Sequence, residues 1–202
     1  LLDMHRAVEA LALEYAFSGE ERFAAHAAHL LRTWFLDPAT RMHPNLLCAQ
    51  WIPGGERAQT AFPPRYVPGA DGREGIYVAF GGVIEGNNLP ALFDLVPLLQ
   101  ESPSWTEADQ AGLQTWAADY TNWLRTHQHG KDEAGCPNNH ASWYVAQVGS
   151  LSLFADQEEV ARRFVTENAR DRIAKQIEPD GRQPYEIGRA VSWHYTCFTL
   201  IS

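Results

Sequence analysis

Two short stretches of the chain gather side chains that can bind an anion and move protons. The first, residues 138–140, reads Asn-Asn-His and offers two amides and an imidazole. The second runs from Arg189 through His194 to Tyr195 and adds a guanidinium, another imidazole and a phenol. A guanidinium and amide N–H groups suit a carboxylate, and an imidazole or a phenol can give or take a proton. Together the two stretches indicate proton-transfer chemistry on an anionic substrate.

The first stretch is expected to begin a helix. Asn138 is a favourable N-cap residue, and it follows a polar turn predicted from His129 to Pro137. The buried face of the helix is marked by Tyr144, Val148 and Leu151. Because a helix N-terminus carries free N–H groups and a positive dipole end, Asn139 and His140 would there surround a carboxylate. If the carboxylate belongs to a uronic acid, its neutralisation acidifies the C5 proton for a nearby base. The alternative is an ordinary helix start with a solvated Asn and a first-turn His.

The second stretch lies on a helix predicted over residues 186–200. Its reactive side chains are Glu186, Arg189, His194 and Tyr195. On a straight helix Arg189 and Tyr195 are roughly 120° apart, from about 100° per residue, so they share only a broad face. The alternative is an amphipathic helix with its aromatic residues buried and Arg189 on the surface.

A third group of candidates lies in a proline- and glycine-rich segment, residues 37–75. His43, Asn45 and Gln50 accompany Trp51 there, and amides beside an aromatic ring suit a sugar. Long ordered loops are more often functional than structural, which predicts a binding loop or lid. The alternative is a solvated loop of polar residues.

The elements that must position these residues are mostly helices. Apolar residues recur at helical spacing in 3–17, 20–36, 88–101, 157–176 and 186–200. A long helix should follow Ser104, with Ser104 as N-cap and Glu107 at the third position. A short strand is conceivable only from Gly75 to Ile84. The pattern predicts an all-α, curved array of helical hairpins.

Composition excludes several classes of protein. The chain has 202 residues, 45% of them apolar, and a formal net charge of −9 from 25 acids and 16 bases, so nucleic-acid binding is not expected. No run of about eighteen apolar residues predicts a membrane span. The three cysteines form no CxxC pair and the histidines lack ligand partners at helical spacing, so we expect no metal. Local positive charge must come from arginines, with Arg57, Arg65, Arg73, Arg182 and Arg189 as candidates.

Several motifs, in order along nearly the whole chain, resemble the alginate lyase domain of the helical toroid polysaccharide lyases. They are Trp34 to Leu46, Ala49-Gln50, Ile52-Pro53-Gly54, Asn138-Asn139-His140, Ala141 to Tyr144, Gln176 to Gly181 and Pro184-Tyr185-Glu186. The resemblance implies an incomplete (α/α) toroid that cleaves a uronic-acid polymer by β-elimination without a cofactor or metal. Residues 1–202 would form a single domain of this type, with part of the toroid, on the N-terminal side, outside them.

The resemblance also implies roles for individual residues. Asn139 would neutralise the substrate carboxylate with help from Arg189, His140 would be the base or the partner of the base, and Tyr195 would protonate the leaving oxygen or perform both transfers. Substrate-binding roles would fall to Asn45, Gln50, Asn138, Trp143, Tyr144, Glu186 and His194.

Several alternatives remain open at this level. Mannuronate-rich alginate is the first expectation for the substrate and glucuronan the second. A toroid glycoside hydrolase would use two carboxylic acids from Glu85, Glu178, Asp180 and Glu186. A non-catalytic uronan-binding protein would leave the polymer intact. We expect a secreted or periplasmic monomer whose partner is the acidic polysaccharide.

Overall fold

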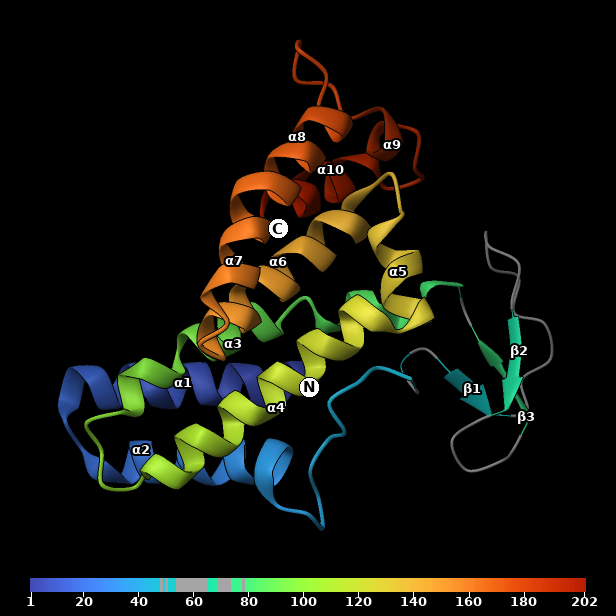
Figure 1. Ribbon diagram of the computed structural model, residues 1–202. Coiled ribbons are helices and arrows are strands. Elements are labelled where there is room, and N and C mark those ends of the chain that lie inside the picture. The colour runs from blue at the N-terminus through green and yellow to red at the C-terminus, as the bar shows by residue number, and fades with distance from the viewer. Residues whose placement is uncertain (48, 50, 54–64, 69–73, 78) are drawn as a thin grey trace.

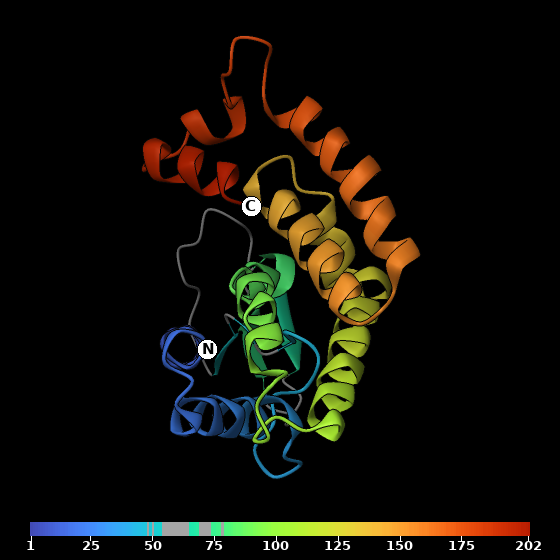
Figure 2. The ribbon, with the colours of Figure 1, turned by 90° about the vertical axis from the view of Figure 1, so that its left-hand side faces the viewer.

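The computed structural model describes residues 1–47, 49, 51–53, 65–68, 74–77 and 79–202, and the side chains of residues 1–47, 49 and 82–202. The described chain is dominated by helices, which Figure 2 shows following an arc from α1 and α2 to α10. The predicted curved array of helical hairpins is confirmed. None of the helices in these ranges has the length and apolarity that a bilayer-spanning segment requires.

The first hairpin consists of α1 (Leu2–Ser18) and α2 (Glu21–Leu31), extended by a turn of π-helix over Arg32–Leu36. Gly19 separates the two helices in the left-handed conformation, with φ of 69°, and its N–H donates to the carbonyl of Tyr15 at 2.8 Å. A residue without Cβ is favoured at this position, which explains why the chain turns there.

The second hairpin begins with α3 (Leu89–Asp94) and a 3-10 turn, Val96–Leu99, and returns as α4 (Glu107–Thr126). The predicted N-cap of α4 at Ser104 is wrong by two residues. Thr106 is the cap, because its hydroxyl accepts the N–H of Asp109 at 3.1 Å while the Asp109 carboxylate accepts the N–H of Thr106 at 2.8 Å. Ser104 instead donates to Glu21, which ties the loop to α2.

The predicted polar turn before Asn138 contains a short helix, α5 (Gln128–Ala134). After it comes α6 (Asn139–Phe154), and the predicted cap is confirmed, because the Asn138 Oδ1 accepts the N–H of His140 at 3.4 Å. Helix α6 lies at the centre of the array, in contact with α3, α4, α5, α7 and α10.

The last elements pack around α6. They are α7 (Glu158–Arg163), a π-turn Phe164–Asn168, α8 (Ala169–Gln176), α9 (Pro184–Ile187) and α10 (Ser192–Leu200). The single helix predicted over 186–200 is therefore two. The chain leaves helical geometry at Val191, whose φ and ψ are −116° and 56°. This break turns α10 back against α6.

A small antiparallel sheet lies beside α5, away from the other helices (Figure 1). Its order is β1 (Trp51–Pro53), β3 (Glu74–Tyr77) and β2 (Arg65–Pro68). The strand expected from Gly75 to Ile84 is thus shorter, because a 3-10 helix starts at Ala79 and ends at Gly86. A Cβ on Gly86 would collide with Gln147 of α6 and Tyr120 of α4, whose hydroxyl donates to the Gln147 Oε1 at 2.6 Å.

The core is rich in aromatic rings stacked between α2, α3 and α4. Phe35 lies 4.8 Å from Trp116 and 5.6 Å from Phe93, centroid to centroid, and Trp116 stacks on Tyr120 at 5.2 Å. Aromatic pairs at these separations contribute about 0.5–1.5 kcal/mol beyond their buried area. The packing fixes α4, and with it α6, which carries the first chemical motif.

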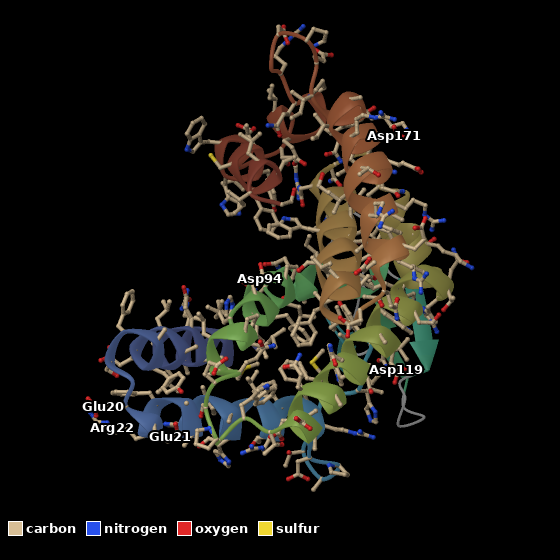
Figure 3. The ribbon with its side chains drawn as sticks, turned by 60° about the vertical axis from the view of Figure 1, so that its left-hand side comes forward. Glu20, Glu21, Arg22, Asp94, Asp119 and Asp171 are labelled. Atoms are coloured by element: carbon tan, nitrogen blue, oxygen red, sulfur yellow. The ribbon has the colours of Figure 1, made fainter. Side chains whose placement is uncertain are left out.

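The charged side chains labelled in Figure 3 lie mostly at the periphery of the arc. Asp119 is exposed on α4 and Asp171 on α8. Asp94 on α3 is also exposed but lines an apolar cavity of about 590 Å³ between α3, α6, α8 and α10, and partial burial raises the pKa of its carboxyl. This cavity is lined mainly by aliphatic side chains and holds neither His140 nor Tyr195.

Acid sensitivity is expected from the contact between the first two hairpins. Arg32 holds the Asp109 carboxylate with two hydrogen bonds of 2.7 and 2.6 Å and lowers its pKa to about 2. Because the pKa in the unfolded chain is about 3.9, this contribution to stability is present above that pH and is lost as the pH falls through about 2. Asp109→Asn should lower the free energy of unfolding by about 1–3 kcal/mol at neutral pH. Thermal unfolding across this pH range tests the prediction, with Asp119→Asn, a substitution of an exposed residue, as control. Equal acid sensitivity of the two variants would contradict a specific role of Asp109.

Candidate active site

The carboxylate of Glu186 is the centre of a buried hydrogen-bond network. Its Oε1 accepts the backbone N–H of Asn139 at 2.6 Å, the Asn139 Nδ2–H at 2.9 Å and the Thr199 hydroxyl at 3.1 Å. Its Oε2 accepts from the Arg189 Nη1 at 3.2 Å. Glu186 is 2% exposed. The network therefore joins the start of α6 to α9 and α10, and it brings the two sequence motifs together.

Arg189 lies between this network and the phenol. Its guanidinium carbon is 3.1 Å from the centroid of the Tyr195 ring, a cation–π contact. The side chain of Arg189 is 25% exposed, and Tyr195 is half-buried. On one continuous helix Arg189 and Tyr195 would point in diverging directions. The short loop between α9 and α10 brings them into contact. The contact holds the Tyr195 ring beside the guanidinium that is bonded to Glu186.

His140 is held from the other side by Glu133, the penultimate residue of α5. The His140 Nδ1 is 2.9 Å from the Glu133 Oε1, and Glu133 is fully buried. Burial raises the pKa of the Glu133 carboxyl, and the hydrogen bond with His140 opposes that rise. A buried carboxylate needs such a partner to offset the cost of its desolvation.

Helix α8 braces the turn that carries these residues. Gln176 donates to the carbonyl of Asn138 at 2.7 Å and accepts from the Ser142 hydroxyl at 2.5 Å. Arg172 donates to the carbonyls of Cys136 and Ala134 at 2.9 and 2.8 Å. The position of the α6 N-terminus is therefore fixed by both α8 and α9.

Asn139 and Asn138 differ in accessibility. Asn139 is 1% exposed, and its amide donates to Glu186. Asn138 is half-buried, and its Oδ1 is occupied by the helix cap.

Trp143, one turn along α6 from Asn139, lines a cavity of about 410 Å³ together with Asn87, Asn88 and Phe198. It packs against Phe198 at 5.0 Å between centroids, and among the described residues its buried Nε1–H has no hydrogen-bond partner. An indole N–H, two amides and an aromatic wall suit a sugar ring.

The structure places the remaining predicted binding residues in other surroundings. His194 is exposed and stacks on Phe198, Tyr144 is buried in the core against Phe164, and the Asn45 Oδ1 accepts the N–H of Leu47 in its own loop. Gln50, Arg57 and Arg73 lie outside the described residues, as does the side chain of Arg65.

One group of potential metal ligands exists among the described residues: Glu133, Cys136 and His140. Burial raises the pKa of the Cys136 thiol to about 12, so without a metal this side chain is neutral. Because the imidazole is already hydrogen-bonded to Glu133, we interpret the group as a proton-bearing cluster.

Sequence reasoning missed three residues that position the site: Glu133, Gln176 and Thr199. The only local signal for Glu133 is its place seven residues before His140, and that spacing has meaning only once α5 is known to be a helix. The long-range contacts of Gln176 and Thr199 have no local signal.

The family model described as alginate lyase matches residues 1–201. A crystal structure of an alginate lyase from Bacteroides ovatus is similar, with 31% sequence identity and a TM-score of 0.81 over 98% of this chain. The match covers 47% of the Bacteroides chain, so the present chain spans about half its length. No functionally curated protein matches the sequence. The likeness confirms the predicted (α/α) toroid fold.

Proposed function

Since this chain belongs to the alginate lyase family, we propose that it cleaves a uronic-acid polysaccharide by β-elimination. The observation that carries the proposal is the Glu186 network, which places an amide, a guanidinium and a phenol on one connected frame. β-Elimination requires three things: neutralisation of the C6 carboxylate, removal of the C5 proton and protonation of the leaving oxygen at C4.

Neutralisation of the carboxylate is assigned to Asn139, assisted by the α6 N-terminus. The remaining amide hydrogen of Asn139 donates to the substrate carboxylate and stabilises the charge that develops when the C5 proton leaves. Arg189 adds positive charge next to this position.

Proton transfer is assigned to His140 and Tyr195. A base removes the C5 proton, the electron pair of that C–H bond forms the C4–C5 double bond, and the C4–O bond breaks. Tyr195 gives its proton to the leaving oxygen, and where the C5 proton and the leaving group lie on the same face it can serve both steps. Arg189 packs on the face of the Tyr195 ring and holds the phenol in place.

Mannuronate-rich alginate is the proposed substrate, with glucuronan as the second candidate. Trp143 and the cavity beside it would bind a neighbouring sugar. The charge of −9 gives no long-range attraction for a polyanion, so recognition must depend on the local arginine and amides. We further propose that the protein acts as a monomer outside the cytoplasm.

A hydrolase is less well supported because three of its four candidate carboxyl groups are engaged elsewhere. Glu186 is buried in the network, and both Glu178 and Asp180 form ion pairs with Arg182, at 3.0 and 2.7 Å. Inverting and retaining hydrolases both need two carboxyl groups facing the scissile bond.

The decisive experiment follows the ultraviolet absorbance of the unsaturated product with polymannuronate, polyguluronate and glucuronan. We expect a rise on polymannuronate and a loss of about 10²- to 10⁴-fold in rate for His140→Ala, because a positioned acid or base contributes that much. His26→Ala, an exposed histidine of α2, is the control and should retain full activity. Chain cleavage without absorbance would indicate hydrolysis, and binding without cleavage a non-catalytic protein.

A further inference from the structure

The proton-bearing cluster beneath His140 has a function that neither the family nor the sequence motif assigns. We propose that Glu133 is a positioning residue, which fixes the orientation of the His140 ring and keeps the proton on its Nδ1, so that Nε2 is the nitrogen that exchanges protons in the reaction. The inference rests on the proposed lyase function for its kinetic consequence, but its structural content can be tested separately.

Geometry supports the assignment. The Glu133 Oε1 lies 2.9 Å from the His140 Nδ1, and because an ionised carboxylate can only accept, we assign the shared hydrogen to the imidazole. Glu133 is fully buried and the His140 side chain is 16% exposed, so water competes little for this bond. A histidine whose second nitrogen is held by a carboxylate has one defined tautomer.

The surroundings of Glu133 leave the His140 imidazole as the side chain that hydrogen-bonds to its carboxylate. The charge of Glu133 also acts on two other titratable groups, Cys136 and Tyr120. Burial is the largest cause of the raised pKa of both groups, and the negative charge of Glu133 raises it further. Both side chains therefore stay neutral. The guanidinium of Arg172, whose charge acts on Cys136, donates to the carbonyls of Cys136 and Ala134.

The cost of the arrangement argues that it serves a purpose. Among the described residues the Glu133 Oε2 is buried without a hydrogen-bond partner, and an unsatisfied buried polar atom costs stability. A neutral side chain of the same shape would avoid much of that penalty. A glutamine at this position, however, could present either its oxygen or its amide to Nδ1 and would permit both tautomers.

The test is Glu133→Gln, followed by nitrogen NMR of the imidazoles and by steady-state kinetics. We expect the wild-type His140 ring to carry its proton on Nδ1 and the variant to show a mixture of tautomers. On polymannuronate kcat should fall by about 10²-fold or more with little change in KM, as expected when a proton-transfer group loses its orientation. The His140 signals are assigned by their loss in His140→Ala.

Controls keep this result separate from the proposed function and from misfolding. Glu159→Gln, an exposed glutamate of α7, should leave both the NMR signals and kcat unchanged. A wild-type spectrum with the proton on Nε2 would overturn the inference without any variant, as would an unchanged tautomer and kcat in Glu133→Gln. If the wild-type protein formed no unsaturated product, the lyase function would fail while the NMR result would still decide the role of Glu133.

Discussion

Tyr195→Phe is expected to reduce elimination by at least about 10³-fold, because the variant removes the only atom of this side chain that can donate a proton to the leaving oxygen. The ring itself remains, so its contact with the Arg189 guanidinium and the packing of α10 should persist. We therefore expect kcat to fall with KM and thermal stability nearly unchanged. Product absorbance on polymannuronate and a melting curve measure the two quantities.

Tyr185→Phe is the matched control for this prediction. Tyr185 lies on α9, one residue before Glu186, and it is 52% exposed. Loss of its hydroxyl should leave activity within about twofold, because surface substitutions of this kind have small effects. If the two variants lost activity equally, or if Tyr195→Phe retained it, the phenol of Tyr195 would not be the acid and the proton transfers would have to be reassigned.

Local patterns were sufficient to predict most of the helices and the start of α6. Asn138 was recognisable as a cap because capping depends on one side chain and the backbone two residues away. The break between the helices predicted over 3–17 and 20–36 lies at Gly19, where a left-handed backbone favours glycine. In each case the deciding interaction lies within a few residues of sequence.

The failed predictions depend on contacts between distant segments. Ser104 has the right chemistry for a cap, but Glu21 binds its hydroxyl and Arg32 holds Asp109 so that Thr106 caps α4 instead. Helix α5 is too short for a periodic pattern. It also needs Gly130, because a Cβ there would strike the Leu124 carbonyl.

In the candidate site, too, local features were predictable and long-range contacts were not. Its motifs were visible in sequence, but their connection through Glu186 was not, because it spans 47 residues from Asn139 and depends on the break at Val191. The resemblance to the alginate lyase domain implied that Glu186 would contact the substrate. The structure gives its carboxylate four protein donors, and we therefore propose a positioning role for it.

Glu186→Gln tests that role and should lower kcat/KM by about 10²-fold or more. The variant keeps the size of the side chain, but its amide faces either Asn139 or Arg189 with a donor where an acceptor is needed. Asn139 and Arg189 should both shift, and a displacement of order 1 Å in an active site costs about 10²-fold. The free energy of unfolding should fall by about 1–3 kcal/mol for the unsatisfied donors.

Glu186→Ala measures how much the Glu186 carboxylate contributes to the stability of the protein. Removing the carboxylate leaves Asn139 unpaired and Arg189 without its counter-ion, which should cost about 3 kcal/mol. The partial exposure of Arg189 relieves some of the full penalty. Glu178→Gln, a surface carboxylate paired with Arg182, should change stability by less than about 1 kcal/mol and leave kcat/KM intact. If Glu186→Gln were less stable than the wild type but equally active, the network would be structural only, and Asn139 would have to bind the substrate without help from Glu186.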